Sequence, residues 1–217
     1  MNDDQLTDRR NFFKHGITRV AKAASDAIEH KVELKAKHWI RPPFARPELD
    51  FLLNCSRCGD CIDACPHGVI FPLPIRRGAE VAATPAMDIL NKGCHLCADW
   101  PCVVACKDQA LLFPSVAPVD ETDAAETATD APVDLVAEIK FPAALDCPPL
   151  AKSKVNTTAC LPYTGPECGA CKGSCPVPDT LVWQSEKPDI VQDNCIGCGL
   201  CREACITNPK AIEIVTL

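Results

Sequence analysis

Seventeen cysteines could do chemistry in this chain of 217 residues, and sixteen of them fall into four groups of four. The first and fourth groups share the spacing C-x2-C-x2-C-x3-C, whereas the second and third are irregular. In chain order the groups are Cys55, Cys58, Cys61 and Cys65; Cys94, Cys97, Cys102 and Cys106; Cys160, Cys168, Cys171 and Cys175; and Cys195, Cys198, Cys201 and Cys205. Soft thiolate ligands of this kind select zinc or iron–sulfur clusters over hard cations.

The spacing within the groups favours iron–sulfur clusters. Three cysteines separated by two-residue gaps can wrap three corners of a [4Fe–4S] cube, and in two-cluster ferredoxins the fourth cysteine ligates the other cluster of the pair. Structural zinc sites more often use two C-x2-C pairs separated by a dozen residues or more. We therefore expect four [4Fe–4S] clusters with all sixteen cysteines as ligands, and keep a zinc-binding structural module as a weaker alternative.

A second repeat accompanies the cysteines, because a short apolar run typical of a strand follows each group. The four runs are Val69–Phe71, Ala110–Phe113, Thr180–Trp183 and Ala211–Val215. Repetition of this kind indicates a duplicated unit. Each unit is predicted to form a cysteine loop, a short helix and a strand. The fold class expected is therefore α+β, with bacterial ferredoxin-like modules that hold two clusters each.

Two pairings of the four groups are open. Sequential pairing joins the first group with the second and the third with the fourth. Nested pairing joins the first with the fourth and the second with the third. We favour nested pairing, because the first and fourth groups share the regular spacing and the other two share the irregular kind.

Composition divides the chain into four parts. Residues 116–139 hold seven acidic residues and no lysine or arginine, which is typical of a solvated linker or surface insertion. We predict a helical arm at residues 1–46, a ferredoxin-like half at 47–115, an acidic linker at 116–146 and a second ferredoxin-like half at 147–217.

The N-terminal arm carries one apolar stripe at three- and four-residue steps. Its members are Phe13, Ile17, Val20, Ala24, Ile28 and Val32. The stripe predicts an amphipathic helix from about Asp8 to His38. Arg9 and Arg10 look like the start of a twin-arginine export motif, but charged residues interrupt the apolar region that should follow. We therefore expect a cytoplasmic protein, and the periplasm through the twin-arginine route is the alternative.

Charge and composition exclude several classes. The formal net charge is −7, and four clusters with their thiolates would take it to about −15. Nonspecific nucleic-acid binding is therefore disfavoured, and a redox partner with a basic docking surface is expected. No stretch approaches about 18 consecutive apolar residues, so we expect no membrane span and leave peripheral association open. The chain has no P-loop, no G-x-G-x-x-G and no zinc-protease helix, and we do not expect an enzyme.

Three motifs make a family resemblance specific. They are Ile40-Arg41-Pro42-Pro43-Phe44, Cys97-Ala98-Asp99-Trp100-Pro101-Cys102 and the run Cys160-x7-Cys168-x2-Cys171-x3-Cys175-Pro176. With them the chain resembles the MauM/NapF-type ferredoxins of periplasmic nitrate reductase and methylamine-utilisation systems, from about Trp39 to Val215 apart from the acidic insertion. The resemblance implies that Cys160 is a ligand and that Cys147 is not.

The predicted function is electron transfer, with single electrons relayed to or from an oxidoreductase partner. The resemblance implies an alternative: a cytoplasmic accessory ferredoxin that acts on an unexported molybdenum enzyme, similar to nitrate reductase, during its maturation. Cys147 is expected to be a spare thiol, with ligation in place of Cys160 as the alternative. His67 and His95 adjoin ligand cysteines, and we expect them to surround a cluster rather than ligate it.

Overall fold

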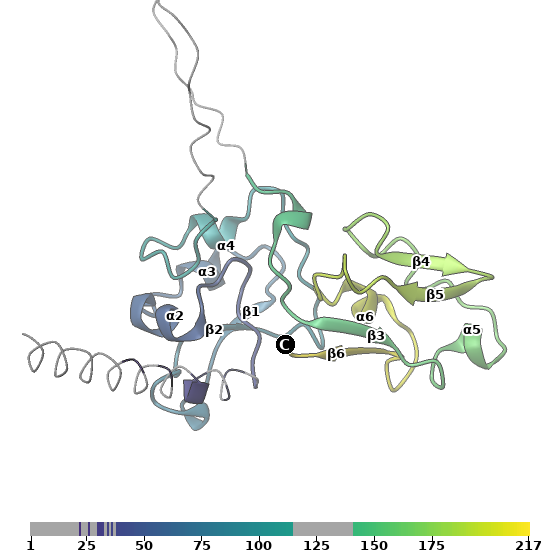
Figure 1. Cartoon of the computed structure of the whole chain (residues 1–217), viewed down its shortest axis with the longest axis horizontal. Helices are drawn as coiled ribbons and strands as arrows, with labels where there is room; N and C mark the ends of the chain where they lie inside the picture. The colour runs from purple at the N-terminus through teal and green to yellow at the C-terminus, as the bar shows by residue number, and fades with distance from the viewer. Residues whose placement is uncertain are drawn as a thin grey trace, which may run out of the picture.

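The structure, a computed structural model, describes residues 38–114 and 141–217, together with Lys22, Asp26, residues 30–32, Leu34 and Ala36. Figure 1 shows the two long described segments next to each other along the long axis of the molecule. Their helices and strands are short, and α2 has seven residues. Much of the remaining backbone is loop that surrounds the cysteines.

The segment of residues 38–114 contains four short helices and one two-stranded antiparallel sheet. Its elements are α2 (Glu48–Asn54), α3 (Asp60–Asp63), β1 (Ile70–Pro72), the 3-10 helix η1 (Ile75–Arg77), β2 (Pro85–Met87) and α4 (Pro101–Val104). β1 pairs with β2, and Ile70 lies opposite Met87. This hairpin returns the chain so that α4 packs against α3.

The segment of residues 141–217 contains two antiparallel pairs of strands. Its elements are the 3-10 helix η2 (Ala144–Asp146), β3 (Lys152–Val155), α5 (Leu161–Thr164), β4 (Leu181–Gln184), β5 (Lys187–Ile190), α6 (Leu200–Ala204) and β6 (Ile212–Val215). β4 and β5 form a hairpin. β3 pairs with β6, so the beginning and the end of this segment lie side by side (Figure 1).

The described residues confirm the mixed α+β class, and three of the four expected strand-like runs overlap β1, β4 and β6. The strand predicted at Ala110–Phe113 is wrong, because this run forms one isolated bridge between Leu111 and Ala45 and no strand. Its partner segment explains this. Residues 42, 43 and 47 are prolines, which cannot donate a backbone hydrogen bond to extend a ladder.

The N-terminal arm is described at a few positions only. Lys22, Asp26, residues 30–32, Leu34 and Ala36 have helical backbone, and Val32 is half-buried. The other five members of the apolar stripe lie outside the described residues. The amphipathic helix and its packing therefore remain predictions.

The largest buried apolar cluster draws on both long segments. Phe51, Trp100 and Leu111 from the first segment are at most 2% exposed, and they share the cluster with Ala151 and Ile196 from the second. A smaller cluster forms around Ile212 in the second segment alone. The cysteine loops lie around and within this interior, so folding of the loops and burial of the core are coupled.

A buried ion pair fixes the start of α2. Arg41 donates from Nε to Glu48 Oε2 at 2.9 Å and from Nη2 to Glu48 Oε1 at 2.5 Å. The two side chains are 9% and 6% exposed. Arg41 Nη1 also donates to the carbonyl of Pro85 at 2.7 Å, and the guanidinium lies 4.4 Å from the centre of the Phe51 ring. The pair therefore ties α2 to β2.

Candidate metal centres

The structure gathers sixteen cysteines into four sets of four, and each set combines two of the sequence groups. Site A comprises Cys55, Cys58, Cys61 and Cys106; site B comprises Cys65, Cys94, Cys97 and Cys102; site C comprises Cys160, Cys168, Cys171 and Cys205; and site D comprises Cys175, Cys195, Cys198 and Cys201. In every case three cysteines come from one group and the fourth comes from the other group of the pair.

This exchange of fourth cysteines corrects the expected pairing. Sites A and B use the first and second groups, and sites C and D use the third and fourth. The nested pairing that we favoured is therefore wrong, and the pairing is sequential. The physical reason is local: the β1–β2 hairpin returns the chain beside its starting point, so α3 and α4 pack together. Shared spacing between distant groups carries no such constraint.

The regular cysteine loops turn at equivalent glycines. Gly59 precedes α3 with φ 87°, and Gly199 precedes α6 with φ 84°. Both values lie in the left-handed region, which glycine adopts without the steric cost of a Cβ atom. Each glycine directly follows the second cysteine of its loop. The turn lets the third cysteine begin a short helix, and the fourth cysteine follows that helix toward the neighbouring site.

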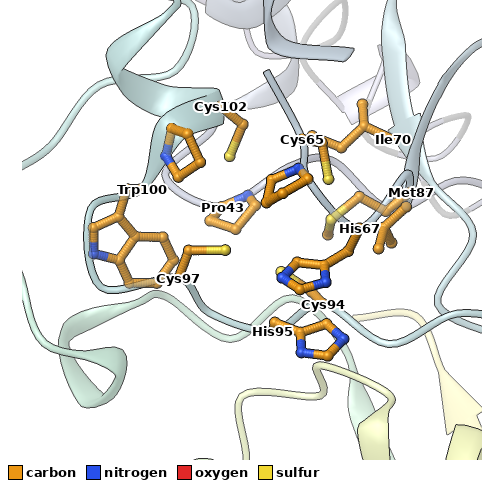
Figure 2. Close-up of a pocket in the computed structure, with 13 residues that line it drawn as sticks. Pro43, Cys65, His67, Ile70, Met87, Cys94, His95, Cys97, Trp100 and Cys102 are labelled. Carbon is orange, nitrogen blue, oxygen red and sulfur yellow. The ribbon is translucent and has the colours of Figure 1, made fainter. Parts of the chain in front are cut away.

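Site B lies in an apolar pocket. Figure 2 shows the sulfur atoms of its cysteines around this pocket, with Trp100 on one side and Met87 on the other. The rings of His67 and His95 stack at a centroid distance of 3.5 Å and an angle of 8°, beside Cys94 (Figure 2). The wall therefore combines apolar side chains with a stacked imidazole pair, and four thiols supply the soft donors.

Sites A and C resemble site B in lining. Phe51 and Leu111 line the pocket at site A. Trp183 and Ile212 line the pocket at site C. Three pockets, each lined by four cysteines and by apolar side chains, fit occupants of one kind.

The electrostatics of the sites favour protonated, neutral thiols unless a cation is bound. Burial and, to a smaller extent, neighbouring thiolates raise the pKa of Cys61 and Cys102 to about 12. Burial likewise raises the pKa of Cys201 in site D to about 12. A buried thiolate among other thiolates is costly unless a cation compensates its charge. An iron–sulfur core with its ferric and ferrous ions would provide that compensation.

Two residues near the thiols were not predicted from the sequence. Burial of Cys205 acts to raise its pKa, but the hydroxyl of Thr207, which lies 3.2 Å from the sulfur, and nearby backbone amides lower it overall. Burial raises the pKa of Cys55, and the positive charge of Arg41 acts to lower it. Arg41 belongs to a motif that the sequence analysis singled out, whereas no spacing signal marked Thr207.

Cys147 lies away from site C. It is 2% exposed and belongs to the large core cluster. Burial, with a smaller contribution from Cys94, raises its pKa to about 12. Cys160, in contrast, lines the site C pocket together with Cys205. The structure thus brings Cys160 and not Cys147 to the remaining cysteines of the third group.

Known proteins resemble this chain in sequence. A model of the 4Fe-4S binding domain family matches residues 188–209, which contain the fourth cysteine group. The methylamine utilization ferredoxin-type protein MauM of Methylorubrum extorquens is 30% identical over 210 residues, which cover 92% of this chain and 83% of the relative. The chain belongs to the MauM/NapG/NapF family of ferredoxin-type proteins.

Other members of the MauM/NapG/NapF family show similar likeness. The ferredoxin-type protein NapG of Haemophilus influenzae is 30% identical over 82% of this chain and 59% of its own length. The ferredoxin-type protein NapF of Escherichia coli is 28% identical over 79% of this chain and 82% of its own length. No solved structure matches the chain.

Membership in the MauM/NapG/NapF family makes this chain a ferredoxin-type iron–sulfur electron-transfer protein. The family resemblance inferred from the sequence motifs is thereby confirmed. Within the described residues, no helix has the length and apolar character needed to cross a membrane.

Proposed function

We propose that each of sites A to D holds one [4Fe–4S] cluster, so that the chain carries four clusters on the sixteen cysteines of its four groups. The exchange of fourth cysteines carries this proposal. Cys65 lines the pocket of site B and Cys106 lines the pocket of site A, as in two-cluster ferredoxins, in which the fourth cysteine ligates the other cluster of the pair. The donors are all thiols, which suit iron–sulfur clusters.

The placement of the thiols supports a cluster over a single zinc ion. Structural zinc draws four thiolates to about 2.3 Å from one ion. In the part of the chain that the structure describes, no three side chains of Cys, His, Asp or Glu converge closely enough for one metal ion. The four thiols of a site instead line one shared pocket, as the corner ligands of a cluster do.

A bound cluster would supply one-electron oxidation and reduction at each site. The cysteine thiolates would bind it, and apolar walls that include Trp100 and Phe51 would exclude water from it. The backbone amide of Leu111 donates to Cys106 Sγ at 3.4 Å, and such hydrogen bonds to sulfur favour the electron-rich state. The described contacts thus serve binding, exclusion of water and tuning of potential.

We further propose that residues 47–115 and 147–217 act as two ferredoxin-like halves that relay single electrons to or from an oxidoreductase in the cytoplasm. The net charge of −7 before any cluster is counted favours a partner with a basic docking surface. The relatives are named for methylamine utilization in the case of MauM. Isolation of the protein with its partner tests this: a catalytically active oxidoreductase supports the relay, and an immature molybdenum enzyme supports the accessory alternative.

Metal analysis tests the cluster assignment directly. Protein prepared without oxygen should contain about 16 iron and about 16 sulfide per chain. A matched pair of variants locates the ligands. Cys160→Ser should lose or convert one cluster, whereas Cys147→Ser should retain all four. Stoichiometric zinc with little iron would refute the assignment, and the opposite behaviour of the two variants would show that Cys147 is the ligand.

A further inference from the structure

The two long segments meet at a contact that involves ligand cysteines from both. The backbone amide of Cys94 donates to the carbonyl of Cys198 at 2.7 Å. Next to it, the amide of Gly93 donates to Glu203 Oε2 at 2.7 Å. Arg202 Nε reaches the carbonyl of Leu90 at 2.9 Å. We refer to this contact, formed by residues 89–94 and 198–203, as the junction.

Glycines allow the backbones to approach each other at the junction. A Cβ atom on Gly93 would lie 2.7 Å from both Cα and N of Leu200, and one on Gly199 would lie 2.6 Å from the carbonyl oxygen of Ile89. The obstacles are backbone atoms, which cannot rotate away. Gly93 is not among the glycines with positive φ. Its own conformation would accept alanine, so the neighbouring segment alone requires a glycine there.

The junction joins site B to site D. Cys94 belongs to site B and Cys198 to site D, so the hydrogen bond between their backbones places the two sites next to each other. Site A neighbours site B, because Cys61 of site A and Cys65 of site B flank the end of α3, which packs against α4. Site C neighbours site D in the same way, because Cys171 of site C and Cys175 of site D are four residues apart in the chain.

These neighbour relations follow the long axis of the molecule. In Figure 1, α3, which carries part of site A, lies toward one end, and α5, next to site C, lies at the other end. α6, which carries Cys201 of site D, lies between them. The sites therefore follow the order A, B, D, C along the axis, which differs from the order of the cysteine groups in the chain.

We propose that Gly93 and Gly199 are positioning residues that hold site B against site D, so that electrons cross between the two halves at the junction and exchange with partners near sites A and C. The proposal rests on the proposed function, because it requires a cluster in each site. One electron that crosses the junction leaves one of these two sites oxidised and the other reduced, with no bond formed or broken.

The test compares two glycine-to-alanine variants next to ligand cysteines. Gly93→Ala inserts a methyl group into the junction. Gly169→Ala is the matched control, because Gly169 directly follows Cys168 and a Cβ atom there would meet nothing within 4 Å. Iron content is measured first. Electron paramagnetic resonance of the stepwise reduced proteins then reports magnetic coupling between neighbouring reduced clusters.

Gly93→Ala should keep its iron and lose the coupling between sites B and D, while the coupling within each half persists. Gly169→Ala should match the wild type in both measurements. Wild-type coupling in an iron-replete Gly93→Ala would overturn the junction and leave the four clusters standing. Wild-type protein without iron would instead refute the proposed function.

A second variant covers failure of Gly93→Ala to fold. Glu203→Ala removes the acceptor of the Gly93 amide without adding bulk, so it should weaken the same coupling while iron is retained. If Gly93→Ala loses its iron, Glu203→Ala decides: weakened coupling supports the junction, and unchanged coupling overturns it.

Discussion

Replacement of Arg41 by methionine should destabilise the protein more than removal of an exposed ion pair would. Methionine keeps an unbranched stem above Phe51 but removes the charge and every donor. Glu48 would then keep one of its three side-chain hydrogen bonds, the one from Trp39 Nε1 at 3.2 Å. The carbonyl of Pro85 would lose its guanidinium donor as well. A buried carboxylate would be left without its counter-charge.

The magnitude follows from this burial. Removing one partner of a buried ion pair costs about 3–5 kcal/mol, a large part of the roughly 5–15 kcal/mol that stabilises an ordinary domain. Iron–sulfur proteins unfold irreversibly once the metal is lost, so the rate of unfolding is the quantity to measure. If about half of the cost appears in that rate, unfolding accelerates roughly 10- to 100-fold.

The assay follows loss of the visible absorption of the clusters in guanidinium chloride containing an iron chelator. Lys107→Ala is the control, because Lys107 pairs with Asp60 at 3.3 Å while its side chain is 85% exposed. Exposed pairs contribute about 0–1 kcal/mol, so this variant should change the rate by less than about tenfold. The double variant Arg41→Met/Glu48→Met should recover much of the loss, because it removes the unpaired carboxylate.

Two outcomes would refute this reasoning. One is an Arg41→Met protein that unfolds no faster than Lys107→Ala, which would mean that Glu48 finds water or another donor. The other is a double variant that unfolds as fast as Arg41→Met alone. The second result would attribute the effect to lost packing on Phe51 and not to the stranded charge.

Three further predictions concern the cysteines. Iron counting in double variants tests the exchange of fourth cysteines between sites. Cys106→Ser with Cys55→Ser should lose one cluster, or about 4 iron, whereas Cys106→Ser with Cys102→Ser should lose two, or about 8 iron. The reverse counts would show that each group ligates its own cluster. Cys147 should resist alkylation at pH 8 in the native protein, because its side chain is only 2% exposed. Its pKa, raised from 9.0 to about 12, also leaves about 1,000-fold less thiolate than in the unfolded chain. Mass spectrometry that finds rapid labelling of the native protein would contradict this. Removal of iron should abolish amide protection across residues 47–114 and 147–217. Any metal-free fold that persists should lose stability as pH rises from about 9 towards 12, because buried Cys61 keeps its proton in the folded state while the unfolded thiol releases it. A metal-free protein that stays protected, or that gains stability over this pH range, would refute the coupling.

Cysteine spacing predicted the chemistry of the sites better than their arrangement. The interval from Cys55 to Cys65 is short, so local geometry alone indicates a cluster loop, and the shared use of fourth cysteines was a known consequence of such loops. The choice of neighbour was not local. Similar spacing in the first and fourth groups suggested nested pairing, but a hairpin between β1 and β2 fixes which groups meet.

Several elements carried too little signal for prediction. β2 consists of Pro85, Ala86 and Met87, all buried, and a proline within three residues gives no alternating pattern. β5 could not be predicted for the same reason, because it contains Pro188. Gly93 also looked unremarkable, because its requirement comes from the backbone of Leu200, more than a hundred residues away. Close approach between distant segments leaves no mark in local sequence.

The exchanged cysteines also impose an order on synthesis. The first three thiols of site A are complete when Cys61 is made, but the fourth, Cys106, follows about 45 residues later, a delay of roughly 2–9 s at ordinary rates of translation. Site B opens later, with Cys65, and yet closes earlier, with Cys102. The second half repeats this order, since site C begins with Cys160 and ends with Cys205, after site D has closed with Cys201. In each half, the site whose first cysteine is synthesised first receives its last cysteine last. The ribosome therefore completes the ligand sets of both sites almost together. Iron delivery to a growing chain would have to supply the two sites as a pair.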